Sequence, residues 1–147
     1  MTLSIIIVNY NVYDDLKECL NSINKNILDI VYEIIVVDNN SVNRDIDKIT
    51  IEYPNVNYIN LSENLGFAKA NNLAVKKANG IYLLFLNPDI IVIRNFAIAL
   101  VEYSKNNNAT GACAPMLLNK DLSYQSSTGP TMGLRYEFLE ALNLISV

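Results

Sequence analysis

Residues 3–8 read LSIIIV and are followed directly by Asn9-Tyr10-Asn11. The run is rich in β-branched residues and does not alternate between apolar and polar positions, which is typical of a strand covered on both faces of a parallel sheet. A helical spacing of apolar residues then begins at Val12, with Asn11 as the predicted cap and Asp14-Asp15 in the first turn. This first unit therefore predicts a strand, a loop and a helix.

The same unit recurs along the chain. Further strands are predicted at 32–37, 55–61 and 81–86, and helices at 42–51 and 67–78, the latter closed by Asn79-Gly80. The pattern continues with an apolar run at 90–93, a helix at 95–105, a strand at 109–118 and a loop at 119–130. Strands that alternate with helices at this spacing predict an α/β domain of three layers, α/β/α, around a mostly parallel sheet.

The last segment, residues 131–147, places four apolar side chains on one face of a predicted helix. They are Leu134, Phe138, Leu142 and Ile145. Such a face either packs on the domain or forms a surface for a partner, a second copy of the chain included, or for a missing half of the protein.

Composition narrows the possible functions. The chain has 147 residues, a formal net charge of -4, and 11 Lys and Arg against 15 Asp and Glu, so we expect one globular domain that does not bind nucleic acid. It has no His, which excludes His-dependent triads and His-ligated zinc sites. The two cysteines, Cys19 and Cys113, are expected to be buried small residues in a reducing compartment.

The N-terminus has no basic leader, and no apolar run approaches the ~20 residues needed to cross a bilayer. We therefore expect a cytoplasmic location, with peripheral attachment to the inner face of the membrane as the alternative.

Polar residues follow three of the predicted strands. Asn9, Tyr10 and Asn11 follow the first, Asp38 with Asn39-Asn40-Ser41 follows the second, and Asn87-Pro88-Asp89 follows the fourth. Ligands of open α/β sheets bind outside the carboxyl ends of the strands, so these clusters are candidate site residues.

Each cluster also has a structural interpretation. Asp38 either forms an Asx turn or accepts a hydrogen bond from the ring N–H of a pyrimidine stacked on Tyr10. Asp89 either begins a turn after Pro88 or holds a divalent cation that shares a diphosphate. The stretch 64–68 either needs Gly66 only for a turn or presents free N–H groups to an anion at a helix start.

Four motifs together resemble the family 2 glycosyltransferases, and most closely their rhamnosyltransferase-like branch. They are SIIIVNYN at 4–11, EIIVVDNNS at 33–41, ENLGFAKANN at 63–72 and LFLNPD at 84–89. The resemblance covers roughly residues 2–130 and implies a GT-A, Rossmann-like fold, a nucleotide-diphospho-sugar donor carrying UDP or dTDP, and Mg or Mn as the cofactor.

The resemblance also implies roles for individual residues. Tyr10 would stack on the base and Asp38 would bind its imide, while Asn64, Gly66 and Asn71 would line the ribose and diphosphate. The remaining nucleotide-binding candidates come from the same motifs, namely Asn9, Asn11, Asn40 and Asn87. Asp89 matches the last carboxylate of the family's DxD motif and is the predicted metal ligand, whereas Asn87 stands at the first position of that motif.

The general base of the family is an Asp or Glu in a later motif that has no counterpart here. The carboxylates after Asp89 stand in other contexts, namely Glu102, Asp121, Glu137 and Glu140. We therefore expect residues 1–130 to be a donor-binding core, residues 131–147 to begin an acceptor half, and the base to lie outside this chain.

The resulting hypothesis is the donor-binding part of an inverting, hexosyltransferase-type enzyme. It would transfer sugar to the hydroxyl of a saccharide or lipid-linked saccharide in surface polysaccharide synthesis. The alternatives are a non-catalytic module that binds nucleotide-sugar or a protein, self-associating through the terminal helix, and a nucleotidyltransferase. The chain lacks the Gly-rich, Lys/Arg-bearing triphosphate loop that the last of these requires.

Overall fold

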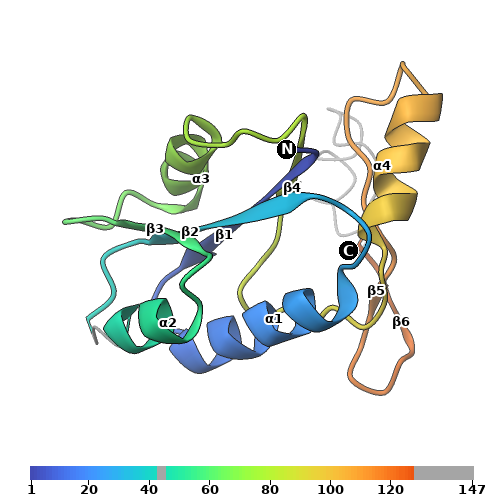
Figure 1. Ribbon diagram of the computed structural model, residues 1–147. Helices are drawn as coiled ribbons and strands as arrows, with labels where there is room; N and C mark the ends of the chain where they lie inside the picture. The colour runs from blue at the N-terminus through green and yellow to red at the C-terminus, as the bar shows by residue number, and fades with distance from the viewer. Residues whose placement is uncertain (43–45, 128–147) are drawn as a thin grey trace, which may run out of the picture. The chain divides into compact units, whose positions relative to one another are not determined.

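A computed structural model describes residues 1–42 and 46–127 of the chain (Figure 1). It divides into two compact units, Met1–Thr110 and Gly111–Val147. The predicted terminal helix at 131–147 lies outside the described residues. The functional division into a core at 1–130 and an acceptor half beyond it stays a prediction.

The first unit is built on a four-stranded sheet in which every pairing is parallel. Its strands are β1 (Leu3–Asn9), β2 (Tyr32–Asp38), β3 (Asn57–Asn60) and β4 (Tyr82–Phe85), in the order β3-β2-β1-β4. The chain builds outward from β1 to β3 and then crosses to the other side of β1 for β4. The strand order therefore reverses between β1 and β4, which is where α/β sheets bind ligands.

Helices cover both faces of this sheet (Figure 1). On one face lie α1 (Tyr13–Asn26) and α2 (Ile46–Glu52), and on the other lies α3 (Phe67–Val75). Residues of β1 point alternately to the two faces of the sheet, and each face has its own apolar core. Ile5 and Ile7 pack with Leu20 of α1 on one face. Ile6 and Val8 pack with Ala70 and Ala74 of α3 on the other. All seven residues of β1 are buried, which explains its continuous apolar run.

The helix α4 (Ala97–Asn106) completes the first unit and confirms the predicted helix at 95–105 within two residues. Between β4 and α4, however, the apolar run at 90–93 does not form a strand. The backbone N–H of Val92 donates to Ser22 Oγ at 2.9 Å, and its carbonyl accepts from Asn26 Nδ2 at 2.7 Å. Side chains of α1 thus satisfy the backbone groups that a strand would have paired.

The predicted ends of two helices were wrong. The residue that caps α1 is Val12, without a side-chain bond, whereas Asn11 has φ 61° and accepts from the backbone N–H of Val42 at 2.8 Å. Helix α3 ends at Val75 rather than at 78, because tighter i to i+3 bonds follow, from Lys77 N–H to the Ala74 carbonyl and from Ala78 N–H to that of Val75.

The second unit contains a short hairpin. The predicted strand at 109–118 is reduced to β5 (Leu117–Leu118), and the predicted loop contains its antiparallel partner β6 (Tyr124–Gln125). The turn between them places Leu122 at φ 66° and bonds Asn119 N–H to the Ser123 carbonyl at 2.9 Å.

The two cysteines differ. Cys19 of α1 is buried as expected, but Cys113 is exposed, so its predicted burial was wrong. None of the helices in the described ranges has the length and apolar character that a bilayer crossing demands.

Candidate functional site

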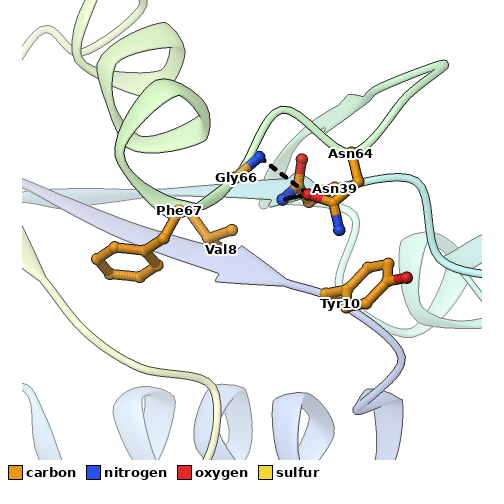
Figure 2. Close-up of a pocket in the computed structure, with 6 residues that line it drawn as sticks. All are labelled: Val8, Tyr10, Asn39, Asn64, Gly66 and Phe67. Carbon is orange, nitrogen blue, oxygen red and sulfur yellow. Dashed lines mark hydrogen bonds between the residues drawn. The ribbon is translucent and has the colours of Figure 1, made fainter.

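A pocket opens at the carboxyl ends of β1 and β2, beside the loop that leads into α3. Its volume is about 310 Å³. It is lined by Val8, Tyr10, Asn39, Asn64, Gly66 and Phe67, which Figure 2 shows. None of these six side chains carries a charge. The lining therefore offers two aromatic rings and neutral hydrogen-bonding groups, which suit a planar heterocycle better than a bare phosphate.

Tyr10 and Phe67 supply the aromatic surface of the pocket. Tyr10 follows the last residue of β1 and is 46% exposed, and Phe67 begins α3 and is 61% exposed. Exposed rings of this size at strand and helix ends are available to stack on a ligand.

Asn39 joins the two loops that form the pocket. Its Nδ2 donates to Asn64 Oδ1 at 2.8 Å, and its Oδ1 accepts from the backbone N–H of Leu65 at 2.9 Å. Asn64 Oδ1 also accepts from the N–H of Gly66 at 2.9 Å, as the dashed line to Gly66 in Figure 2 marks. The N–H groups of Leu65 and Gly66 are therefore already bonded, and the prediction that this loop presents free amides to an anion was wrong for these two.

Gly66 is required by the conformation of this loop. Its φ is +78°, in the left-handed region that other residues rarely adopt, and a Cβ there would meet nothing within 4 Å. The turn into α3 therefore depends on backbone conformation and not on space.

Asp38 is not among the residues that line the pocket and is 6% exposed. Its Oδ1 accepts from Asn9 Nδ2 at 2.8 Å, from the Tyr13 hydroxyl at 3.0 Å and from Ser41 Oγ at 2.6 Å, and its Oδ2 accepts from Ser41 N–H at 3.1 Å. This carboxylate therefore ties β1, α1 and the loop after β2 together. Its role in binding the imide of a base stays a prediction.

Three other predicted site residues surround this network. Asn9 is fully buried, and its Oδ1 has no hydrogen-bond partner among the described residues. Asn11 and Asn40 are exposed and have φ of 61° and 64°, so both act as left-handed turn residues. Asn11 N–H donates to Ser41 Oγ at 2.9 Å, which links the loop after β1 to the loop after β2.

The remaining candidates do not line the pocket. Asn71 is buried in α3, and its Nδ2 donates to the Phe67 carbonyl at 2.9 Å. Asn87 and Asp89 are exposed after β4, where the Asn87 carbonyl accepts from Ile90 N–H at 3.2 Å and lies 3.8 Å from the Cys19 thiol. Burial, with a smaller contribution from the charge of Asp89, raises the pKa of Cys19 to about 12, so this thiol is not a nucleophile near neutral pH.

The donor set for a divalent cation is incomplete. Within residues 1–42 and 46–127, no group of three or more His, Cys, Asp or Glu side chains could hold a metal. Asp89 offers one exposed carboxylate. Mg²⁺ takes six oxygen ligands, so a diphosphate and water would have to supply most of them.

The sequence did not single out Val8 or Phe67 as binding residues, and it placed Asn39 among the candidates only as part of the polar cluster after the second strand. Asn39 stands in the same polar loop as Asp38. The composition of this loop does not show that Asp38 makes buried hydrogen bonds while Asn39 lines a pocket. The clearest signal available in the sequence was the position of Phe67, an aromatic residue directly after Gly66 at the predicted helix start; its exposure to solvent is seen only in the structure.

Fold and site together define an α/β domain that binds its ligand at the carboxyl ends of parallel strands. The family model described as "Glycosyl transferase family 2" matches residues 4–143. The chain therefore belongs to the family 2 glycosyltransferases, and its fold is of the GT-A type, as the motifs predicted.

Relatives and solved structures agree with this assignment. The chain is 34% identical over 114 residues to a poly(ribitol-phosphate) beta-glucosyltransferase of Bacillus spizizenii, covering 74% of this chain and 18% of that protein. It is 34% identical over 106 residues to the rhamnosyltransferase WbbL of Escherichia coli, covering 67% and 39%. The crystal structure of S. aureus TarS 1-349 in complex with UDP superposes with a TM-score of 0.61 at 29% identity, covering 71% and 33%.

The chain thus spans less than two fifths of the length of each of these three proteins, with 39% as the largest share.

Proposed function

We propose that this chain binds the nucleotide-diphospho-sugar donor of an inverting, hexosyltransferase-type glycosyltransferase that acts in cell-surface polysaccharide synthesis. The observation that carries the proposal is the uncharged pocket in which Tyr10 lies opposite the paired amides of Asn39 and Asn64. Two findings support it: TarS, a structural neighbour, is solved with UDP, and the Bacillus spizizenii relative is named as a glucosyltransferase acting on poly(ribitol-phosphate).

The base of the donor, uracil or thymine, stacks on Tyr10 and lies against Asn64 in this proposal. Asp38 keeps the loops after β1 and β2 in place through its four hydrogen bonds, of which Oδ1 accepts three and Oδ2 one, so the imide contact proposed for Asp38 would fall on Oδ2. The diphosphate extends toward Asn87 and Asp89 at the end of β4.

Asp89 would hold Mg²⁺ or Mn²⁺ together with the diphosphate, and a cation there supplies charge neutralisation of the departing nucleoside diphosphate. In an inverting transfer the acceptor hydroxyl attacks the anomeric carbon, the bond to the diphosphate breaks, and a carboxylate takes the hydroxyl proton. No carboxylate is among the six residues that line the pocket, so we assign donor binding to this pocket and not the role of general base.

Thermal unfolding with UDP, dTDP, GDP and ADP, each with and without Mn²⁺, tests the proposal. A ligand at ~100 times its Kd adds about 2.7 kcal/mol, which corresponds to a shift on the order of 5 to 10 °C for this size. Among the four nucleotides, we expect only UDP and dTDP to raise the Tm. This rise should depend on Mn²⁺ in the wild type, and Asp89→Ala should remove that dependence.

Tyr10→Ala should abolish the shift, whereas Tyr103→Ala should keep it. Tyr103 lies on α4, outside the pocket, and is 53% exposed against 46% for Tyr10, so the two variants remove rings of similar exposure. A shift of equal size with all four nucleotides, or none with any of them, would contradict donor binding. Binding without any sugar transfer to an added saccharide would favour a non-catalytic nucleotide-sugar module.

A further inference from the structure

The two paired amides of the pocket have a fixed polarity. A carboxamide can present either its oxygen or its nitrogen to a neighbour, but a backbone N–H can only donate. Leu65 N–H requires an acceptor at Asn39, and Gly66 N–H requires an acceptor at Asn64. Both facing atoms must therefore be Oδ1.

This polarity leaves one arrangement of the pair. Asn39 Oδ1 accepts from Leu65 N–H, so Asn39 Nδ2 points toward Asn64. There it donates to Asn64 Oδ1, the same oxygen that accepts from Gly66 N–H. The Asn64 Nδ2 has no acceptor among the described residues, and in Figure 2 this nitrogen projects toward the Tyr10 ring. Asn39 is 3% exposed, so water does not compete for its two bonds.

We propose that Asn39 is a specificity-determining residue that acts through Asn64, by holding its amide so that only an N–H donor faces the ligand. The inference rests on the proposed function, because the ligand group it reads is on the base of the donor. A fixed N–H donor beside Tyr10 donates to the 4-carbonyl oxygen of uracil or thymine, whereas the 4-amino group of cytosine would face it with a second donor. Asn39 is thus a positioning residue, and Asn64 makes the contact.

The experiment compares the Kd of UDP with that of CDP by calorimetry. An unpaired donor facing another donor costs about 1 to 3 kcal/mol, so the wild type should favour UDP by roughly tenfold or more. Asn64→Asp keeps acceptors for Asn39 Nδ2 and Gly66 N–H but turns an oxygen to the pocket, so the preference should change to CDP.

Asn39→Asp is the decisive variant. Its carboxylate still accepts from Leu65 N–H but places an acceptor against Asn64 Oδ1, which is itself an acceptor. The Asn64 amide relieves this repulsion by reversing, which gives up the bond from Gly66 N–H and presents Oδ1 to the ligand. We expect the UDP preference to fall by about tenfold or to invert, without an equal loss of affinity for both nucleotides. Asn24→Asp is the matched control: Asn24 is exposed on α1, accepts from the Tyr32 hydroxyl at the opposite end of the sheet, and should leave the ratio unchanged.

The outcomes separate the two ideas. If the wild type binds UDP but Asn39→Asp weakens UDP and CDP by the same factor, donor binding stands and the role of Asn39 is overturned. If the wild type binds neither, the proposed function fails and this inference fails with it. Scalar couplings across the bonds from Leu65 and Gly66 N–H to the side-chain carbonyls, measured by NMR in the free chain, test the amide polarity without ligand, and couplings absent from both amides would refute it.

Discussion

At the scale of single residues, Asp38 is the side chain on which most of the site's geometry depends. Asp38→Ala removes the acceptor of four hydrogen bonds and leaves the buried Nδ2 of Asn9 without its strongest partner, so we expect a loss of about 3 kcal/mol in the free energy of unfolding. Urea denaturation measures it. Glu18→Ala, an exposed carboxylate of α1, should change stability by less than about 0.5 kcal/mol. Equal effects of the two would show that Asp38 is not a structural tie.

Gly80 is the residue at which added volume should be least tolerated. A Cβ there would collide with the backbone of Ser4 and lie 2.7 Å from Ser4 Oγ and from the Leu3 carbonyl carbon, all in the buried strand β1. Gly80→Ala should therefore destabilise the first unit by about 2 kcal/mol. Gly111→Ala, where nothing lies within 4 Å, is the control and should leave the Tm unchanged.

Glu33 gives the fold a pH dependence. Burial raises its pKa, but hydrogen bonds from Ser4 Oγ at 2.6 Å and from the backbone and side chain of Asn79 more than offset burial and hold the pKa below its ordinary value of 4.5. A lowered folded-state pKa stabilises the fold above the unfolded value, and this stability is lost as pH falls through the folded value.

The wild type should therefore lose Tm as the pH falls below 4.5, and Glu33→Gln should flatten this part of the profile. Scans of Tm from pH 7 to pH 3, in about half-unit steps, measure both. Glu63→Gln replaces an exposed carboxylate, so its Tm should change with pH in the same way as that of the wild type. A flat wild-type profile below 4.5 would contradict the assigned cause.

At the scale of secondary-structure elements, α1 and β4 contribute differently to stability. Leu20 of α1 is fully buried, whereas Leu83 of β4 is 40% exposed on the face where Phe85 is also exposed. We expect Leu20→Ala to cost about 3 kcal/mol and Leu83→Ala to cost less than about 1 kcal/mol. Chemical denaturation of this matched pair checks the difference, and a larger loss at Leu83 would mean that the β4 face is covered in solution.

The elements also show what the sequence could predict. The strands β1 and β2 were predicted closely, because a β-branched run buried on both faces has few alternatives. The run at 90–93 has the same composition, but Ser22 and Asn26 bond its backbone instead of a neighbouring strand, and these partners lie 66 to 70 residues away in sequence. Local pattern carries no information on such partners.

The site was predictable to a similar degree. The carboxyl ends of parallel strands located the pocket, and Tyr10, Asn64 and Gly66 are in it. The division of roles between Asp38 and Asn39 was not predictable, because it depends on which side chain reaches the loop before α3 across 25 residues of sequence.

At the scale of the whole molecule, the division after Thr110 predicts an independent first unit. All four strands of the parallel sheet and all six residues that line the pocket lie within Met1–Thr110. A chain of residues 1–110 should therefore unfold cooperatively and bind UDP within about threefold of the full-length Kd, since the contacts that order the pocket are retained. Calorimetry and circular dichroism of both chains measure this. A truncated chain that is folded yet fails to bind UDP would show that the second unit contributes to the site.

Because β1 lies in the middle of the sheet, the two walls of the pocket, Tyr10 and residues 64–66, should move on different timescales. Its amides are flanked by β2 and β4 and open to solvent only when the sheet separates, so hydrogen exchange should be slowest there. Tyr10 extends directly from this strand, whereas the opposite wall, at 64–66, is attached to β2 through the side chain of Asn39. An arriving ligand therefore meets one side of the pocket whose backbone continues from the most protected strand and one that is held by side-chain hydrogen bonds, so we expect the backbone of the loop before α3 to adjust faster than the backbone at Tyr10.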